Sequence, residues 1–549
     1  MSIFFRNKGT QYLIHFVLTC RIKYCVPLFS EVEFPMHFLI EGLICWVVTA
    51  VIGFKIIKDV IWWTGFIKWQ SWSNAHLWEG LAIFIIFHFS VVSLAFLYRR
   101  IFSQLSLVFI YLNLQLFFYL LFLIKGLFLA CLPEQSWWLM IYAVLLIFWR
   151  VLPKNKPEGP VYKNGIPLFG KVLIGIWVLS SVCLWIPDNW DANRKVFVDE
   201  GSFWVNAGEQ MVKMGINAAH KVPYPGGGLH PLGIPFMVSA PMTWSGWRDS
   251  WAIYCWPLVI IFSLGLWLFS QRWGKWALLF FMSSLLVVFS NDFWPAQLMY
   301  QLVYGESICV ILVLVFLSEI WFCVRKSAMT PGTMLALSGA IGLLALTKAP
   351  SNMIVIPLEL TFLFLVFRYQ RSMINAPLVI GCLGFSLFPL LIWSVYVRHF
   401  HILLLSTSWH FLDLLGRIPH PDTGLLLLSL KSMWGLDQNM VYVICLSIVM
   451  IGLTAFSMRF LMVPVLLWIM AWFFYYAYIY NYSTGQGDYL SGLRYMIPVV
   501  LALYWAAACA YQEAIDYLFK KNTAMAHLLQ GLSVIFLIMI LFFRKCFLI

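Results

Sequence analysis

The sequence predicts an all-α protein that crosses a membrane many times, and its composition carries that prediction. Of its 549 residues, 62% are hydrophobic and only 11% are charged, whereas soluble domains carry about 25% charged residues. Aromatic residues reach 18%, with 28 Trp, which suits rings placed at the interfaces of a bilayer. Because helices pair their own backbone polar groups inside lipid, we expect a polytopic helical membrane protein.

Net charge and cysteine content fit the same class. Lys and Arg collect in the cytoplasmic loops of membrane proteins. The net charge of +13 is therefore explained without a nucleic-acid partner. No run of basic residues resembles a nucleic-acid-binding patch. Most of the 12 cysteines lie in apolar stretches, where Cys acts as a small hydrophobic residue. No CxxC pair predicts a zinc site or a disulfide framework.

Apolar stretches long enough to span a bilayer, about 17–25 residues each, divide the chain into helices. They number about fifteen, within a range of roughly 13–16 transmembrane helices. The predicted stretches are 36–57, 80–98, 104–130, 137–152, 168–187, 250–270, 275–290, 301–324, 333–347, 350–368, 377–397, 439–457, 459–481, 494–517 and 527–543.

The first 35 residues match no signal-peptide pattern, since they mix apolar residues with charges. A better hydrophobic segment begins at Met36. The sequence therefore leaves open whether translation starts at Met1 or at Met36, and whether residues 1–35 are ordered.

The distribution of Lys and Arg among alternate loops predicts the orientation of the helices. The basic loops, expected in the cytoplasm, contain Arg99-Arg100, Lys154, Lys156, Lys163, Arg272, Lys275, Arg325-Lys326, Arg368, Arg371, Arg459 and Lys520-Lys521. The opposite set, expected outside, comprises 188–249, 291–300, the junction at Lys348, 398–438 and 482–493. Residues Lys55, Lys58, Lys68 and Arg544-Lys545 run against this pattern. An enzyme acting outside lacks nucleotide sugars, so its donor would have to be carried across by a lipid.

The outer loop 188–249 holds paired carboxylates, Asp199 and Glu200, in front of a candidate amphipathic helix. The apolar residues of that helix recur at helical spacing and form one stripe. Such a helix can lie in the membrane interface, which would hold both acids near a lipid headgroup. The alternative is that Asp199 or Glu200 only caps this helix.

Downstream of the acidic pair, a turn with three glycines leads into His230 and Pro231. Glycines let a backbone approach a ligand closely, although the segment also fits a plain turn with a structural His230. The loop 398–438 contains His and Asp residues at spacings that match no tight metal motif. We interpret that loop as a cover or acceptor-binding segment.

Three charged residues lie at the ends of apolar stretches: Glu306, Lys348 and Arg494. Charge at depth in a membrane is costly and usually serves a purpose, although each residue could also snorkel to an interface. Lys348 and Arg494 are expected on the side of Asp199. Two cations beside a carboxylate are typical of a site that binds a phosphate-bearing lipid. Arg binds phosphate through two hydrogen bonds, and Lys acts as a point charge.

Several short motifs in this order resemble the GT-C superfamily of integral-membrane glycosyltransferases. They are the acidic pair at 199–200, His-Pro-Leu-Gly-Ile-Pro-Phe at 230–236, Tyr-Gly-Glu at 304–306, Ala-Leu-Thr-Lys-Ala-Pro at 345–350 and Gly-Leu-Arg-Tyr-Met-Ile-Pro at 492–498. The likeness is closest to the branch of protein O-mannosyltransferases and the lipid A aminoarabinose transferase. It covers 168–517, preceded by extra N-terminal helices in 36–167 and followed by a C-terminal helix and tail in 518–549.

The resemblance implies a transferase that uses a polyprenyl-phosphate sugar and faces the periplasm or exterior of a bacterial inner membrane. It implies Asp199 as the catalytic base, with Glu200 second, and Lys348, Arg494 and Tyr495 at the donor phosphate. Further residues with a substrate-binding or structural role are His230, Glu306 and Asp488. Some members use a divalent metal such as Mg²⁺ or Mn²⁺, and no metal ligand is assigned here. The acceptor is a glycan, a lipid or a protein.

Two other functions stay open at the level of the sequence. An O-antigen polymerase or ligase would place its essential residues in 398–438 and leave Asp199 dispensable. A transporter or flippase of lipid-linked sugars would require inverted repeats and ionisable residues near the middle of the membrane. The sequence clearly shows neither inverted repeats nor ionisable residues at that depth.

Overall fold

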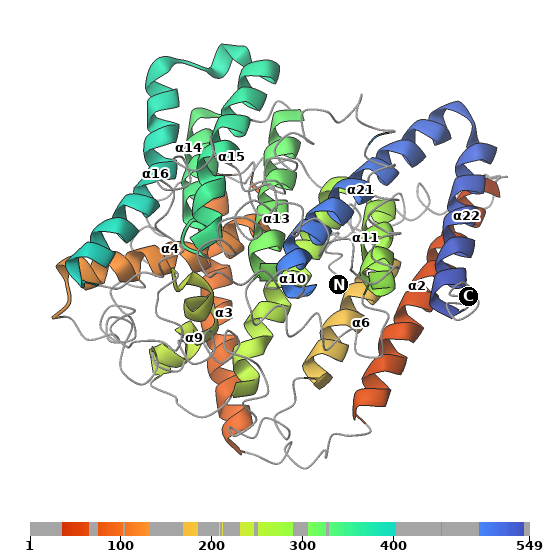
Figure 1. Cartoon of the computed structure of the whole chain (residues 1–549), viewed down its shortest axis with the longest axis horizontal. Coiled ribbons are helices and arrows are strands. Elements are labelled where there is room, and N and C mark those ends of the chain that lie inside the picture. Colours follow the sequence, from red (N-terminus) through yellow and green to blue (C-terminus); the bar gives the residue numbers. More distant parts are fainter. Residues whose placement is uncertain are drawn as a thin grey trace, which may run out of the picture.

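The fold is all-helical throughout the part of the chain that the structure describes. This structure is a computed structural model, and it describes residues 36–64, 75–102, 105–131, 168–184, 208, 211, 231–245, 251–288, 306–325, 329–347, 349–401, 452 and 493–542. All regular secondary structure in these ranges is helix (Figure 1). The predicted all-α class is confirmed for them.

The α-helices have the following bounds: α2 (Met36–Thr64), α3 (Ala75–Ile101), α4 (Leu107–Phe128), α6 (Leu168–Leu184), α9 (Gly233–Ser245), α10 (Trp251–Trp273), α11 (Lys275–Val288), α13 (Glu306–Arg325), α14 (Pro331–Leu344), α15 (Ala349–Tyr369), α16 (Ala376–His399), α21 (Leu493–Lys521) and α22 (Thr523–Phe542). A single 3₁₀ turn, η4 (Arg371–Met373), joins α15 to α16.

Each predicted apolar stretch that falls within the described ranges contains a helix. Two helices run well past the predicted ends: α2 continues to Thr64 and α21 to Lys521. A hydropathy window ends a stretch where charged residues lower the average, whereas the backbone hydrogen bonds of a helix continue through charged residues. The predicted stretches 137–152, 439–457 and 459–481 lie outside the described residues, apart from residue 452.

Three of the described helices contain a segment that is long and apolar enough to cross a bilayer. These segments are Leu39–Ile57, Leu107–Phe128 and Ala376–His399. On α16, the large apolar residues Ile380, Leu387 and Leu391 are 69%, 42% and 59% exposed, and their spacing places them on one face. Soluble proteins rarely expose a continuous apolar face of this kind. Lipid is the solvent that suits it, in agreement with the predicted membrane class.

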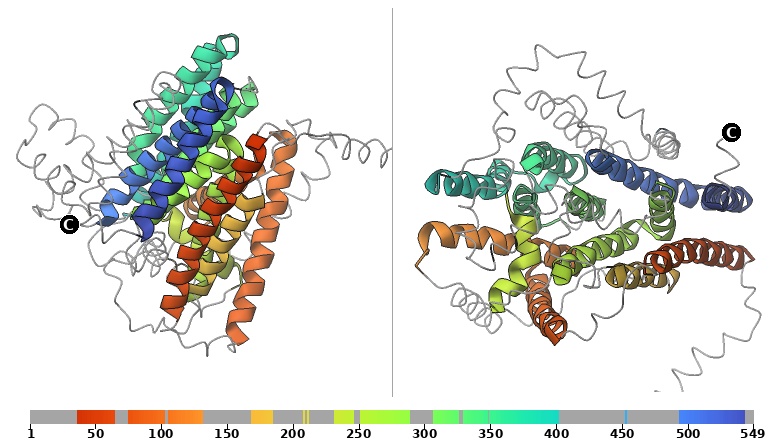
Figure 2. Two further views of the ribbon diagram at one scale, coloured as in Figure 1. Left: turned by 90° about the vertical axis from the view of Figure 1, so that its right-hand side faces the viewer. Right: turned by 60° about the horizontal axis from the view of Figure 1, so that its bottom comes forward.

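The helices lie side by side in a slanted bundle (Figure 2). Helix α14 packs along α16, α10 along α13, and α2 along α6. The contact between α14 and α16 is close because Gly342 faces the backbone of Ser386. A Cβ atom at Gly342 would lie 2.4 Å from the carbonyl oxygen of Ser386. Membrane helices commonly use small residues in this way to bring two backbones together.

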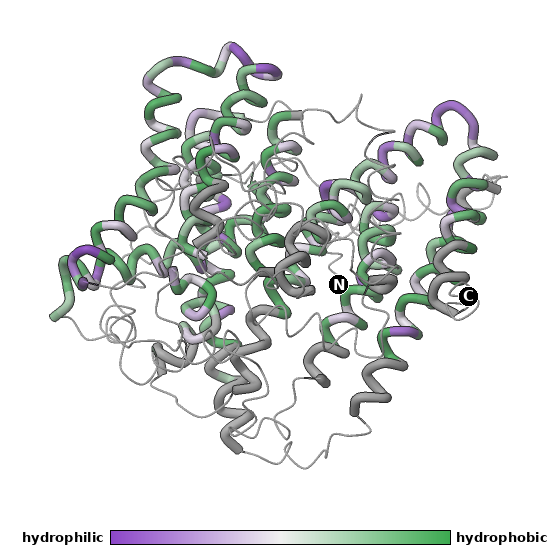
Figure 3. The backbone as a smooth tube through the Cα atoms, viewed as in Figure 1, coloured by the Kyte–Doolittle hydropathy of each residue, from purple (hydrophilic) through white to green (hydrophobic). Residues whose placement is uncertain are grey.

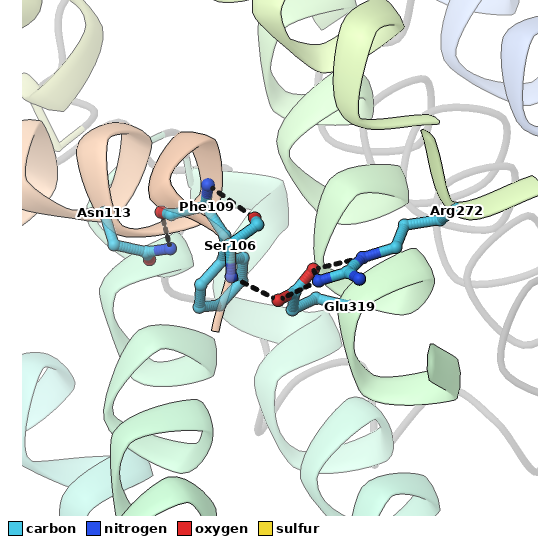
Figure 4. A network of polar contacts seen from close by, with 5 residues as sticks. All are labelled: Ser106, Phe109, Asn113, Arg272 and Glu319. Atoms are coloured by element: carbon cyan, nitrogen blue, oxygen red, sulfur yellow. Dashed lines mark hydrogen bonds and ion pairs between the residues drawn. The ribbon is translucent and has the colours of Figure 1, made fainter. Parts of the chain in front are cut away.

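A buried ion pair connects three helix ends at one end of the bundle (Figure 4). The guanidinium of Arg272, at the end of α10, donates to both oxygens of Glu319 on α13 at 2.7 Å. The side chains of Arg272 and Glu319 are 1% and 0% exposed. The Ser106 amide donates to Glu319 Oε1 at 2.7 Å, while Ser106 Oγ accepts from the Phe109 amide and caps α4.

The corner between α10 and α11 is fixed by side chains from other helices. Gly274 forms this corner with φ +113, a backbone conformation that favours glycine. Gln512 of α21 then caps α11, since its Oε1 accepts from the amides of Trp276 and Ala277 at 2.9 and 3.2 Å. Lys275 forms an ion pair with Glu41 at the start of α2.

These polar contacts gather the helix ends that adjoin the predicted basic loops. Gln370, at the end of α15, extends the set by donating to the Val324 carbonyl of α13 at 3.0 Å. Figure 3 shows hydrophilic residues at the turn between α15 and α16 and at the turn between α21 and α22, with long hydrophobic stretches along the helices. We refer to this end of the bundle as the basic end.

Candidate functional site

The candidate site lies where the start of α9 meets the turn between α14 and α15. The Gly233 amide donates to the Leu346 carbonyl at 3.0 Å. A Cβ atom at Gly233 would lie 2.4 Å from that same carbonyl oxygen. Only glycine allows this approach, which gives a structural reason for Gly233 in the motif 230–236.

Helix α4 holds the other side of the α9 start. The Leu232 amide donates to the hydroxyl oxygen of Tyr119 at 2.9 Å. Tyr119 is fully buried, and its ring packs against Phe236 with centroids 5.5 Å apart. The extra N-terminal helices therefore contribute a residue to this junction, a contact that the sequence did not predict.

The turn Ala345–Thr347 continues α14 with three i to i+3 hydrogen bonds, of which the last joins the Thr347 amide to the Leu344 carbonyl at 3.1 Å. The Thr347 hydroxyl also donates to the Leu344 carbonyl, at 2.7 Å. Cys309, in the first turn of α13, lies with its Sγ 3.4 Å from Thr347 Oγ1. The turn thus touches α9 and α13 at once.

Three of the motifs noted in the sequence adjoin this junction: 230–236, 304–306 and 345–350. Gly233 of the first motif bonds to Leu346 of the third, and Thr347 of the third contacts Cys309, which follows the motif 304–306 on α13. On α13, Cys309 precedes Glu319 by ten residues, about 15 Å along the helix. The junction therefore lies about 15 Å along α13 from the ion pair at the basic end.

The candidate site residues are placed only in part. Glu306 begins α13, and Arg494 and Tyr495 belong to the first turn of α21; their side chains lie outside the described residues. Asp199, Glu200, His230, Lys348 and Asp488 also lie outside them, so their roles stay predictions. Of the loop 398–438, the structure describes the residues up to His401, which is exposed and has φ 49.

The described ranges contain no set of ligands for a metal ion. Their His, Cys, Asp and Glu side chains form no group of three that could hold an ion. Cysteines predicted to act as small hydrophobic residues are buried where they are described: Cys45, Cys309, Cys382 and Cys509.

Sequence reasoning missed one buried acid. Glu359 lies in the middle of α15 and is 1% exposed. Its Oε1 accepts from the Ser338 hydroxyl of α14 at 2.7 Å, while its Oε2 has no hydrogen-bond partner within the described part of the chain. The signal was available in the sequence, since a single Glu interrupts the apolar stretch 350–368 and such residues are functional candidates.

Comparisons with family models, curated proteins and solved structures found no match for this chain.

Proposed function

We propose that the protein is an integral-membrane glycosyltransferase that moves a sugar from a polyprenyl-phosphate donor to an acceptor hydroxyl. The reaction takes place on the outer face of the membrane, in the periplasm or at the exterior of a bacterial cell. One observation carries the proposal: the starts of α9 and α13 meet the α14–α15 turn through the Gly233–Leu346 and Cys309–Thr347 contacts. Two short motifs of the resemblance, 230–236 and 345–350, thereby meet, and the helix that begins at the motif 304–306 adjoins them.

Asp199 acts as the general base in this proposal. An acceptor hydroxyl attacks the anomeric carbon opposite the phosphate, the carbon–oxygen bond to the phosphate breaks, and Asp199 takes the hydroxyl proton. The product is inverted at the anomeric carbon, by analogy with inverting glycosidases. Glu200 orients the acceptor or shares a divalent metal such as Mg²⁺ or Mn²⁺.

The leaving phosphate needs positive charge rather than a proton. Lys348, which directly follows the turn ending at Thr347, and Arg494, at the start of α21, supply that charge, with Tyr495 beside them. Fixed cations placed where negative charge develops are a strong source of transition-state stabilisation. His230, Glu306 and Asp488 have supporting roles in substrate binding or structure.

The proposal is tested with two variants of the full-length protein in lipid nanodiscs. Labelled polyprenyl phosphate serves as the binding probe because it is common to all donors of this class. Transfer is measured as release of polyprenyl phosphate from lipid-linked sugars extracted from the producing membranes. Asp199→Asn should bind the probe normally and abolish transfer. Arg494→Ala should weaken probe binding by about 10- to 150-fold, the equivalent of about 1.5–3 kcal/mol for hydrogen bonds to a charged group.

Retained transfer by a well-folded Asp199→Asn protein would refute the base assignment. An unchanged probe titration for Arg494→Ala would refute its phosphate role. If transfer survives in Asp199→Asn but is lost when charges in 398–438 are neutralised, a polymerase or ligase is the better description.

A transporter of lipid-linked sugars is the second candidate, and Glu359 is the observation that favours it. A buried acid in the middle of α15, bonded to Ser338 of α14, fits the ionisable mid-membrane residues that transporters use. Glu359→Gln should abolish transport of a lipid-linked sugar into vesicles if this function is correct. Under the transferase proposal, the same variant should keep its transfer activity.

A further inference from the structure

A deep apolar groove of about 480 Å³ runs between α4, α14 and α16. This volume falls within the roughly 300–1,000 Å³ of pockets that bind small ligands. Phe109 and Phe117 of α4 form one wall, Gly339 of α14 forms the floor, and Phe385 and Phe388 of α16 form the other wall. Among the described residues that line it, Tyr98 and Asn113 carry the polar side-chain atoms.

The groove opens toward the surroundings of the bundle. Phe385 and Phe388, at its edge, are 55% and 46% exposed. The two flanking helices, α4 and α16, are among those long and apolar enough to span a membrane. Lipid therefore borders the groove, and an empty groove would forfeit dispersion contacts along its walls. A hydrocarbon chain satisfies those contacts without bringing a polar group into the groove.

The length of the groove identifies the kind of chain. Along α14 the groove extends from Gly332 to Leu343, eleven residues or about 16 Å of helix. One leaflet contributes about 15 Å to the roughly 30 Å hydrocarbon core of a bilayer. The groove thus matches one acyl chain of one leaflet, whereas a polyprenyl chain is much longer.

Charge at one end of the groove indicates the headgroup. The groove reaches Tyr98 and Phe102 at the end of α3, where α3 joins the basic end of the bundle. Arg99 directly follows Tyr98 and lies at this end of α3. The Arg99 guanidinium supplies a positive charge near this end of the groove, and a guanidinium forms strong charge-assisted hydrogen bonds to a phosphate group.

We propose that this groove binds one acyl chain of an anionic phospholipid, with the lipid phosphate beside Arg99. The site is separate from the proposed transferase chemistry and requires only that α4 and α16 lie in a membrane. The ligand stabilises the contact between the N-terminal helix α4 and the α14–α16 pair, because it packs against all three.

The test uses full-length protein in nanodiscs containing phosphatidylglycerol with a photoactivatable acyl chain, and labelled peptides are mapped after digestion. Label should concentrate on the groove walls of α4, α14 and α16. Gly339→Leu fills the floor of the groove: a Cβ atom there lies 3.6 Å from Phe385, an ordinary contact. Labelling should fall about tenfold in this variant, as expected when about two methylene groups lose their burial.

Gly384→Leu is the matched control, since Gly384 is exposed on α16 with no atom within 4 Å of its added Cβ; it should keep full labelling. Should Gly339→Leu fail to fold, Gly332→Leu serves as the second filling variant. Arg99→Gln should remove the preference for phosphatidylglycerol over phosphatidylcholine. Unchanged labelling in both filling variants, or equal labelling of the exposed α16 face, would overturn the proposal. So would displacement of the label by polyprenyl phosphate but not by unlabelled phosphatidylglycerol.

Discussion

At the scale of single residues, the ion pair of Arg272 and Glu319 decides how three helices meet. The two charges are buried, so their mutual attraction must offset the loss of hydration. Glu319 also accepts the Ser106 amide, which ties the start of α4 to the same carboxylate. Removing Glu319 therefore takes the partner from a buried charge and from a backbone amide together.

This predicts a large effect of Glu319→Ala. The free energy of unfolding, measured by denaturant titration in detergent, should fall by about 3–5 kcal/mol, because the buried Arg272 guanidinium loses its carboxylate. The double variant Arg272→Met/Glu319→Gln leaves no charge unpaired and keeps an acceptor for Ser106, so it should lose much less. Equal losses in the single and double variants would contradict this explanation.

At the scale of helices, glycines set the distance between α14 and α16. Gly342 meets the Ser386 carbonyl, whereas Gly384 on α16 meets nothing within 4 Å. Sequence alone does not distinguish the two, since both sit in apolar helices and glycine is common in membrane helices for more than one reason. Only the partner helix reveals which glycine is required.

Gly342→Ala should separate α14 from α16 and lower the free energy of unfolding by about 1–3 kcal/mol, the usual cost of overpacking. Gly384→Ala should be neutral or slightly stabilising, because alanine reduces the entropy of the unfolded chain. Thermal unfolding of the purified variants in detergent measures both. If the two variants unfold at the same temperature, the close backbone contact does not govern the packing of these helices.

At the scale of the whole molecule, hydropathy predicted the class and nearly every described helix, because membrane helices must be long and apolar. It could not find the contacts that join them. Arg272 and Glu319 are 47 residues apart, and Leu232 meets Tyr119 across 113 residues. Both pairs form only after the helices assemble. The predicted motifs at 230–236 and 345–350 do adjoin one junction, while the roles of Asp199 and Lys348 stay predictions.

The predicted orientation of the protein in the membrane places the two ends of the bundle on opposite sides. Arg371, in η4, is exposed beside α15 and α16, and Asn522 lies between α21 and α22; both adjoin predicted cytoplasmic loops. Cys131, at the end of α4 opposite the Ser106 cap, is exposed, and α4 would place it across the membrane from Arg99-Arg100. Because cytoplasmic loops of membrane proteins carry an excess of Lys and Arg, we expect the two groups to face opposite compartments.

Single-cysteine variants test this orientation in intact cells with a maleimide that cannot cross the membrane. Arg371→Cys and Asn522→Cys should react only after the membrane is opened, whereas Cys131 and Asp199→Cys should react in intact cells. Reaction of all four from the same side would contradict the alternation of loops. Reaction of Asp199→Cys only in opened cells would remove the acidic pair from the outer face. The lipid-linked donor would then lose its rationale, because nucleotide sugars are available in the cytoplasm.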